Sequence, residues 1–160
     1  MNDTLKCYVA GSKPDNTSKS GIISFAVPEY GIIFRCGVEG TLTDLNIIAF
    51  LTFLRFAEHN KDIFKKRELH IFTDFPLLVY LMNDGSASVK GLGAVRKQAE
   101  KYARGFLFKV KWINRRDNRA AQPVNSIPIL PAHSDLKIKS FIELDSQKKS
   151  DRTKNLSESQ

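Results

Sequence analysis

The sequence contains few cysteines, and the two that are present lie far apart. Only Cys7 and Cys36 are cysteine, and no pair has the close spacing of a zinc or redox motif. Both fall in apolar runs, which predicts two small buried thiols in a reducing compartment. No apolar stretch is long enough to cross a bilayer, and residues 1–6 are too polar for a signal peptide. We therefore expect a soluble, cytoplasmic protein with no membrane partner.

The sequence also lacks the common catalytic and phosphate-binding patterns. It has no glycine-rich phosphate loop. Its three histidines, His59, His70 and His133, are scattered, and neither cysteine has an obvious base partner. His70 interrupts an apolar run, which is typical of a hydrogen-bonded core histidine rather than an acid–base group. Carboxylates remain as the candidate catalytic groups.

Positive charge, by contrast, is concentrated in one segment. The net charge is +8, and residues 90–119 hold ten basic residues against two acidic ones, so this segment accounts for the whole excess. A localised basic excess is typical of a protein with a polyanion partner. The alternative is a solvated helix face followed by a basic loop, which needs no partner.

The spacing of apolar residues predicts a single α/β domain. Runs bounded by turn-forming residues predict strands over residues 5–9, 21–27, 32–38, 68–72 and 106–113. Helical spacing predicts helices over residues 41–58, 75–82 and 93–104. The first helix can be capped by Thr41, Thr43 or Asp44.

The order of these elements predicts how they pair. Strands two and three form a hairpin at one edge, and the helical crossovers that follow favour parallel pairing of strands one, four and five. We place the domain in residues 1–131. Residues 132–144 are expected to form an extension, either a further strand or a docked segment, and residues 145–160 a disordered polar tail.

Four short motifs follow one another on the predicted elements. The first strand ends in Ala10-Gly11-Ser12. Asn46 lies in the first turn of the first long helix, five residues after a Thr and three before an Ala. The fourth strand ends in Thr73-Asp74. The fifth strand leads into a loop, residues 112–122, that reads Trp-Ile-Asn-Arg-Arg-Asp-Asn-Arg-Ala-Ala-Gln.

In this order the motifs resemble the ribonuclease H (RNase H) family, over residues 5–122. The resemblance implies a five-stranded mixed sheet of order 3-2-1-4-5, with strand two antiparallel and helices at its sides. Family members carry four metal-binding acids where this chain has Ala10, Asn46, Asp74 and Gln122. The resemblance therefore implies a degenerate catalytic site. The chain also departs from the family at Pro123, which interrupts the helix expected there.

The loss of three acids predicts the loss of two-metal catalysis. Two Mg²⁺ ions about 4 Å apart need several carboxylates to hold them and to offset their charge. Asp74 alone offers at most weak binding of one Mg²⁺, so we expect no catalytic residue and no cofactor. Asp74 can instead cap the helix that starts at Phe75. Asp15, Asp44 and Asp117 lie near the matched positions and are candidates for replacement ligands, although Asp44 points away on its helix.

Three functions remain open. The first is an inactive RNase H-like module, a pseudoenzyme, that binds RNA, DNA or a hybrid through a basic surface. Its expected contacts are Ser12, Arg96, Lys97, Lys101, Arg104, Arg115, Arg116 and Arg119. The second is a protein-interaction or structural module, with a protein partner or a second copy docked on apolar segments 127–130 and 141–144. The third and least favoured is an active metal-dependent hybrid nuclease. One contiguous basic patch favours the first function, and scattered basic residues favour the second.

Overall fold

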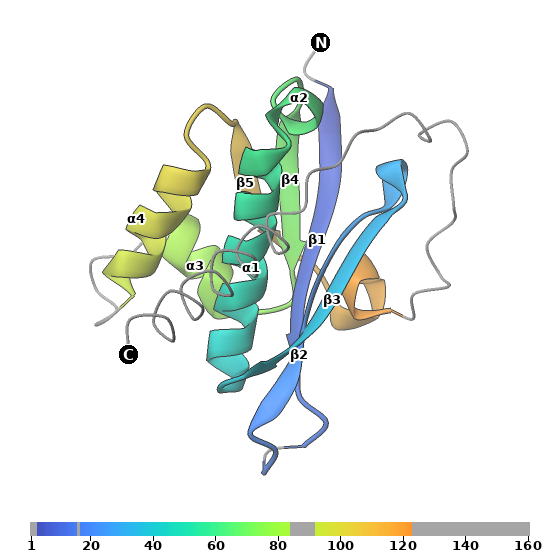
Figure 1. Ribbon diagram of the computed structural model, residues 1–160, viewed down its shortest axis with the longest axis vertical. Helices are drawn as coiled ribbons and strands as arrows, with labels where there is room; N and C mark the ends of the chain where they lie inside the picture. The colour runs from blue at the N-terminus through green and yellow to red at the C-terminus, as the bar shows by residue number, and fades with distance from the viewer. Residues whose placement is uncertain (1–2, 16, 84–91, 123–160) are drawn as a thin grey trace, which may run out of the picture.

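Figure 1 shows the computed structural model, which describes residues 3–15, 17–83 and 92–122. In chain order the elements are β1 (Thr4–Ser12), β2 (Ser20–Val27), η1 (Pro28–Tyr30), β3 (Ile32–Glu39), α1 (Leu42–His59), α2 (Lys61–Phe64), β4 (Glu68–Thr73), α3 (Pro76–Asn83), α4 (Gly93–Tyr102), β5 (Phe108–Trp112), η3 (Arg115–Asp117) and η4 (Arg119–Ala121). All of the predicted strands and helices occur. The predicted extension and tail lie outside the described residues.

The five strands form one mixed sheet in the order β3-β2-β1-β4-β5. β2 is antiparallel to β1 and β3, whereas β4 is parallel to both β1 and β5. This topology confirms the predicted sheet. β1 is the central strand, since Tyr8 pairs with Ala26 of β2 on one side and with Phe72 of β4 on the other.

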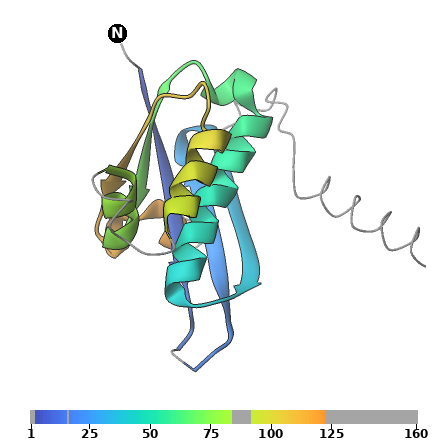
Figure 2. The same ribbon diagram turned by 90° about the vertical axis from the view of Figure 1, so that its left-hand side faces the viewer.

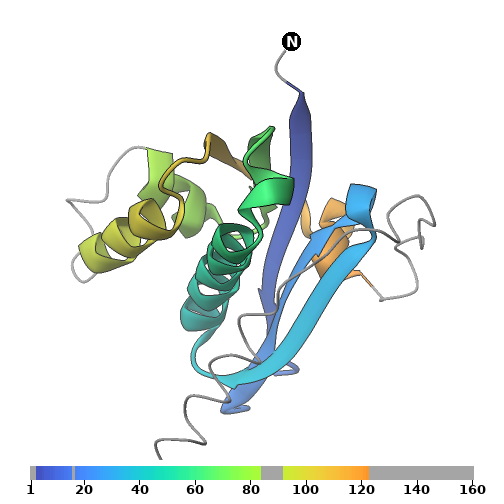
Figure 3. The ribbon, with the colours of Figure 1, turned by 45° about the horizontal axis from the view of Figure 1, so that its top comes forward.

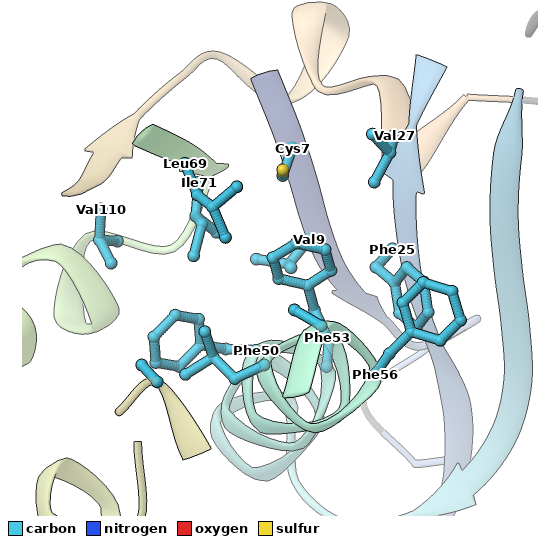
Figure 4. Packing of buried hydrophobic residues seen from close by; sticks show 14 of the residues in the cluster. Cys7, Val9, Phe25, Val27, Phe50, Phe53, Phe56, Leu69, Ile71 and Val110 are labelled. Atoms are coloured by element: carbon cyan, nitrogen blue, oxygen red, sulfur yellow. The ribbon is translucent and has the colours of Figure 1, made fainter. Parts of the chain in front are cut away.

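The hydrophobic core lies between one face of the sheet and α1. Alternate residues of β1, among them Cys7 and Val9, point toward α1, and Ile71 of β4 does the same (Figure 4). α1 meets them with Phe50 and Phe53, which are fully buried. Burying a large apolar side chain contributes about 1.5–3 kcal/mol. This layer therefore fixes α1, which carries Asn46, against β1, which carries Ala10, and against β4, which leads into Asp74.

A capping box fixes the start of α1. The Thr41 hydroxyl accepts the Asp44 N–H at 3.1 Å, and the Asp44 carboxylate accepts the Thr41 N–H at 3.0 Å. Thr41 is thus the cap that the sequence allowed for. α1 and α4 lie on one face of the sheet, and η4 lies on the other (Figures 2 and 3). None of the helices in the described ranges is long and apolar enough to cross a membrane.

The two cysteines differ in their surroundings. Cys7 is buried on β1, as predicted, and burial raises the pKa of its thiol. Cys36 is exposed, so the prediction of a buried thiol is wrong there. The reason is its position on β3, an edge strand on which Arg35, Cys36 and Gly37 are all exposed. An apolar run alone does not distinguish an edge strand from a central one.

Candidate functional site at the strand ends

Asp74, the one acid among the four matched positions, is engaged by the loop that follows β5. Arg115 Nη1 donates to Asp74 Oδ2 at 2.9 Å, and Asn118 Nδ2 donates to Asp74 Oδ1 at 3.3 Å. The Asp74 side chain is only 11% exposed. Each carboxylate oxygen therefore has a donor from the protein, and one of these donors is a cation.

Asp74 does not cap the next helix, so that alternative is wrong. The hydroxyl of Thr73, which is fully buried, accepts the Phe75 N–H at 3.1 Å just before α3 begins. Thr73 thus provides the hydrogen bond expected of Asp74. Thr73 therefore accepts the hydrogen bond before α3, and the side chain of the adjacent Asp74 is available to pair with Arg115.

Asn118, a member of the loop motif that had no predicted role, holds the site together. It is completely buried. Its Nδ2 donates to the Val9 carbonyl at 2.9 Å as well as to Asp74, and its Oδ1 accepts the Ala120 N–H at 3.1 Å. A buried amide needs such partners. The sequence signal that could have identified it is the loop motif itself, because Asn118 stands at the asparagine position of the RNase H-like pattern.

Asn46 joins the start of α1 to the end of β1. Its Oδ1 accepts the Gly11 N–H at 3.2 Å, and its Nδ2 donates to the Leu42 carbonyl at 2.9 Å. The contact is close, because a Cβ added to Gly11 would lie 2.7 Å from backbone atoms of Leu45 and Asn46. Asn46 is 3% exposed, so its amide acts as a buried bridge between strand and helix.

Ala10 lies in a cluster of small side chains on the sheet face opposite α1. It is 2% exposed and belongs to one buried cluster with Ala26 and Ala120. Beside it, Ser24 Oγ donates to the Ala120 carbonyl at 2.7 Å and so ties η4 to β2. The methyl group at position 10 thus allows η4 to pack closely on the sheet.

Gln122 closes the loop in which Arg115 and Asn118 lie. Its Nε2 donates to the carbonyl oxygens of Arg116 at 3.0 Å, Arg115 at 3.3 Å and Asn118 at 3.5 Å. The three matched positions without an acid therefore have packing or hydrogen-bonding roles of their own.

The candidate replacement acids are engaged elsewhere. Asp15 accepts hydrogen bonds from the hydroxyl and N–H groups of its own turn, which lower its pKa to about 2. Asp44 belongs to the capping box, and those hydrogen bonds lower its pKa as well. Asp117 is 60% exposed and lies 3.8 Å from Arg116, so it does not turn in toward Asp74. Within the described residues, no group of three or more His, Cys, Asp or Glu side chains is placed to hold a metal ion.

The basic residues expected to contact nucleic acid fall into two groups on different elements. One group belongs to α4 and the turn after it, on the α1 face, and comprises Arg96, Lys97, Lys101 and Arg104. The other belongs to η3 and η4 and comprises Arg115, Arg116 and Arg119. Ser12 is half-buried at the end of β1, where it pairs with Ile22. Two separate elements, α4 and the loop after β5, therefore carry these side chains.

The sheet order and the flanking helices are those of the RNase H-like fold, and this chain has that fold. RNase H1 from the halophilic archaeon Halobacterium salinarum NRC-1 has a TM-score of 0.59 at 14% identity, over 78% of this chain and 94% of that chain. The N-terminal RNase H domain of a Mycobacterium tuberculosis protein has a TM-score of 0.59 at 18% identity, over 81% of this chain and 96% of that chain. LC11-RNase H1, solved in complex with an RNA/DNA hybrid, has a TM-score of 0.59 at 18% identity, over 77% of this chain and 92% of that chain.

No protein-family model matches the sequence. No curated protein matches it either. The solved structures confirm the predicted fold, and at these identities they bear on the fold alone.

Proposed function

We propose that the chain is an RNase H-like module that binds nucleic acid and does not cleave it. The observation that carries the proposal is the ion pair of Asp74 with Arg115, in which a guanidinium lies 2.9 Å from the carboxylate. Two-metal hydrolysis needs several carboxylates around the ions. The matched positions offer only Asp74, and its charge is already offset. The proposal therefore assigns no catalytic residue and no cofactor, with Mg²⁺ bound weakly at most.

Cations beside the strand ends support the nucleic-acid part of the proposal. The Arg115 and Arg116 side chains are 52% and 83% exposed, and both lie on η3 beside Asp74. Exposed cations in such a position can contact phosphates of a duplex without reading its sequence. One structural neighbour was solved with an RNA/DNA hybrid. The proposal therefore takes RNA, DNA or a hybrid as the partner. It also keeps the cytoplasmic location that was expected from the sequence.

A protein-interaction or structural module is the second candidate, and the division of the basic residues favours it. Arg96 Nε pairs with Glu100 at 3.1 Å on α4, so part of the basic charge there is offset within the helix. A solvated basic helix needs no polyanion. The apolar segments expected to meet a partner, residues 127–130 and 141–144, lie outside the described residues.

Fluorescence anisotropy with a labelled RNA–DNA hybrid tests the proposal. Arg116→Gln is a clean variant, because Arg116 is exposed and Arg115 has a structural role at Asp74. Lys97→Gln with Lys101→Gln tests α4, where both side chains are exposed. Lys61→Gln, on α2, is the matched control for charge.

The salt dependence decides between the two candidates. Removing one cation that binds a phosphate should lower the slope of log K against log salt by about 0.9. We expect this change for Arg116→Gln and no change for Lys61→Gln. Absence of binding to RNA, DNA and hybrid at low salt would overturn the proposal and favour the interaction module.

A further inference from the structure

The sheet face opposite α1 presents a second chemically distinctive surface. On β1 and β4 the core residues alternate with half-buried or exposed ones, so Lys6, Tyr8, His70 and Phe72 project from the opposite face. η4 packs on this face against β1 and β2 (Figure 3). Over β4 and β5 the face is only partly buried, since Lys109 and Lys111 of β5 are exposed.

Two aromatic rings lie side by side on this face. Tyr8 and Phe72 are opposite one another in the parallel β1–β4 register, and their ring centroids are 5.3 Å apart with planes inclined by 24°. Both side chains are half-buried. Aromatic rings that are not covered by the core provide the surface on which nucleic-acid bases stack, whatever the base.

A pocket of about 260 Å³ opens beside Tyr8. It is lined by Thr4, Lys6, Tyr8, Pro28, Glu29 and Arg119. Lys6 is exposed, and Arg119 extends from η4. Burial raises the pKa of the Tyr8 hydroxyl, and the nearby Arg119 charge opposes this rise, so the ring remains a neutral phenol with a cation beside it.

The acidic residues on this face are already paired. Glu29 Oε2 lies 2.8 Å from Arg67 Nη1. Glu68 Oε1 lies 3.1 Å from His70 and 3.5 Å from Lys109, and the His70 hydrogen bond lowers the Glu68 pKa. The face therefore presents a net positive charge around a neutral aromatic pair, which is complementary to a phosphodiester strand with unpaired bases.

The geometry points to a subsite for single-stranded nucleic acid on this face, with a phosphate between Lys6 and Arg119 and a base against the Tyr8–Phe72 pair. A duplex does not fit this chemistry, because its bases are already paired and stacked. The subsite is separate from the strand ends, where Asp74 and Arg115 lie. It does not depend on the proposed duplex binding.

Anisotropy of a labelled oligouridylate with the full chain tests the subsite. Lys6→Gln removes one cation, and Tyr8→Leu removes the ring. The matched controls are Lys61→Gln, an exposed lysine on α2, and Tyr80→Leu, a tyrosine 44% exposed on α3. Thermal melts show whether each variant folds. Tyr8→Phe keeps the ring and removes only the hydroxyl, and Phe72→Leu removes the other ring of the pair if Tyr8→Leu does not fold.

We expect Tyr8→Leu to weaken oligouridylate binding about tenfold, as loss of one stacked base does. Lys6→Gln should weaken it and lower the salt slope by about 0.7, the value for single strands. Tyr8→Phe and both controls should bind like the wild type. Hybrid binding should be unchanged in the Tyr8 variants, so failure of the duplex proposal and failure of the subsite are distinguishable.

Three results would overturn the subsite. The first is unchanged oligouridylate affinity in Lys6→Gln and Tyr8→Leu. The second is equal affinity for uridine monophosphate and the oligonucleotide, which would mean that no strand is recognised. The third is an equal loss of affinity in Tyr80→Leu and Tyr8→Leu, which would mean that the effect does not come from the aromatic pair.

Discussion

Arg115 Nη1 donates to Asp74 Oδ2 at 2.9 Å, from the loop after β5 to the end of β4. Asn118 donates to the other carboxylate oxygen, so the charge of Asp74 is balanced by the chain itself. A carboxylate in this state has little to offer a divalent cation, because binding the ion would first require loss of the arginine. The Asp74–Arg115 ion pair thus balances the carboxylate charge that a bound metal ion would otherwise balance.

Replacing Arg115 should destabilise the fold more than replacing its neighbour. In Arg115→Gln the Asp74 carboxylate, 11% exposed, keeps its hydrogen bond from Asn118 but loses the cation that balances its charge. We expect a loss of about 1–2 kcal/mol in the free energy of unfolding, measured by urea denaturation. Arg116→Gln, on an 83% exposed side chain, should lie within about 0.5 kcal/mol of the wild type. Equal effects would show that the ion pair has no structural role.

Restoring the missing acids should make stability depend on Mg²⁺. The variant Ala10→Asp, Asn46→Glu, Gln122→Asp places carboxylates where Ala10 and Asn46 are 2% and 3% exposed. Without metal it should melt below the wild type, because like charges near Asp74 repel and lose hydration. Mg²⁺ at about 100 times its Kd should restore about 2.7 kcal/mol, seen in thermal melts.

The control for the restored acids is the uncharged set Ala10→Asn, Asn46→Gln, Gln122→Asn. It has similar side-chain volumes and should not respond to Mg²⁺. If both sets respond equally, or neither does, the matched positions do not converge on one site.

Gly11 should not tolerate a side chain. A Cβ there would lie 2.7 Å from backbone atoms of α1, which cannot move aside as a flexible side chain can. We expect Gly11→Ala to cost at least about 1–3 kcal/mol by urea denaturation, as overpacking does. Gly37→Ala is the control, since its nearest neighbour would lie at 3.9 Å. Equal stability of the two variants would contradict the close contact of β1 with α1.

The capping box should contribute stability that is lost in acid. The hydrogen bonds from Thr41 lower the pKa of Asp44, so the folded state favours the charged carboxylate. That contribution is present above the unfolded pKa of about 3.9 and is lost as pH falls through the lower folded pKa. Thr41→Ala should lower stability at neutral pH and reduce this loss. Denaturation between neutral and acidic pH measures both, and Thr43→Ala, at the second residue of α1, should behave like the wild type.

Much of the fold could be predicted from the sequence, because periodicity marks buried faces. Apolar residues such as Phe50 and Phe53 recur at helical spacing, and runs such as residues 68–72 have the composition of buried strands. Four short motifs on those elements were enough to place Asp74 at a strand end. The prediction of burial was wrong for Cys36 at the sheet edge, because strand pairing and edge position are tertiary properties that a local pattern does not contain.

The partners of the site residues could not be predicted from spacing. Asp74 and Arg115 are far apart in the sequence, and only the parallel β4–β5 pairing brings their strand ends together. Asn118 bonds across 109 positions to Val9, a contact that no local pattern contains. The basic segment, although continuous in sequence, is divided because β5 separates α4 from η3. Clustering of charge in the sequence therefore does not tell whether the basic residues form one patch on the folded surface.

A single gel experiment tests the central claim most directly. The full chain is incubated with a labelled RNA–DNA hybrid at low salt, with Mg²⁺ and separately with Mn²⁺, and each reaction is run on a native and a denaturing gel. The account predicts a shifted band on the native gel and intact RNA on the denaturing gel with either metal. RNA cut in the presence of metal, and spared when EDTA is added, would contradict it.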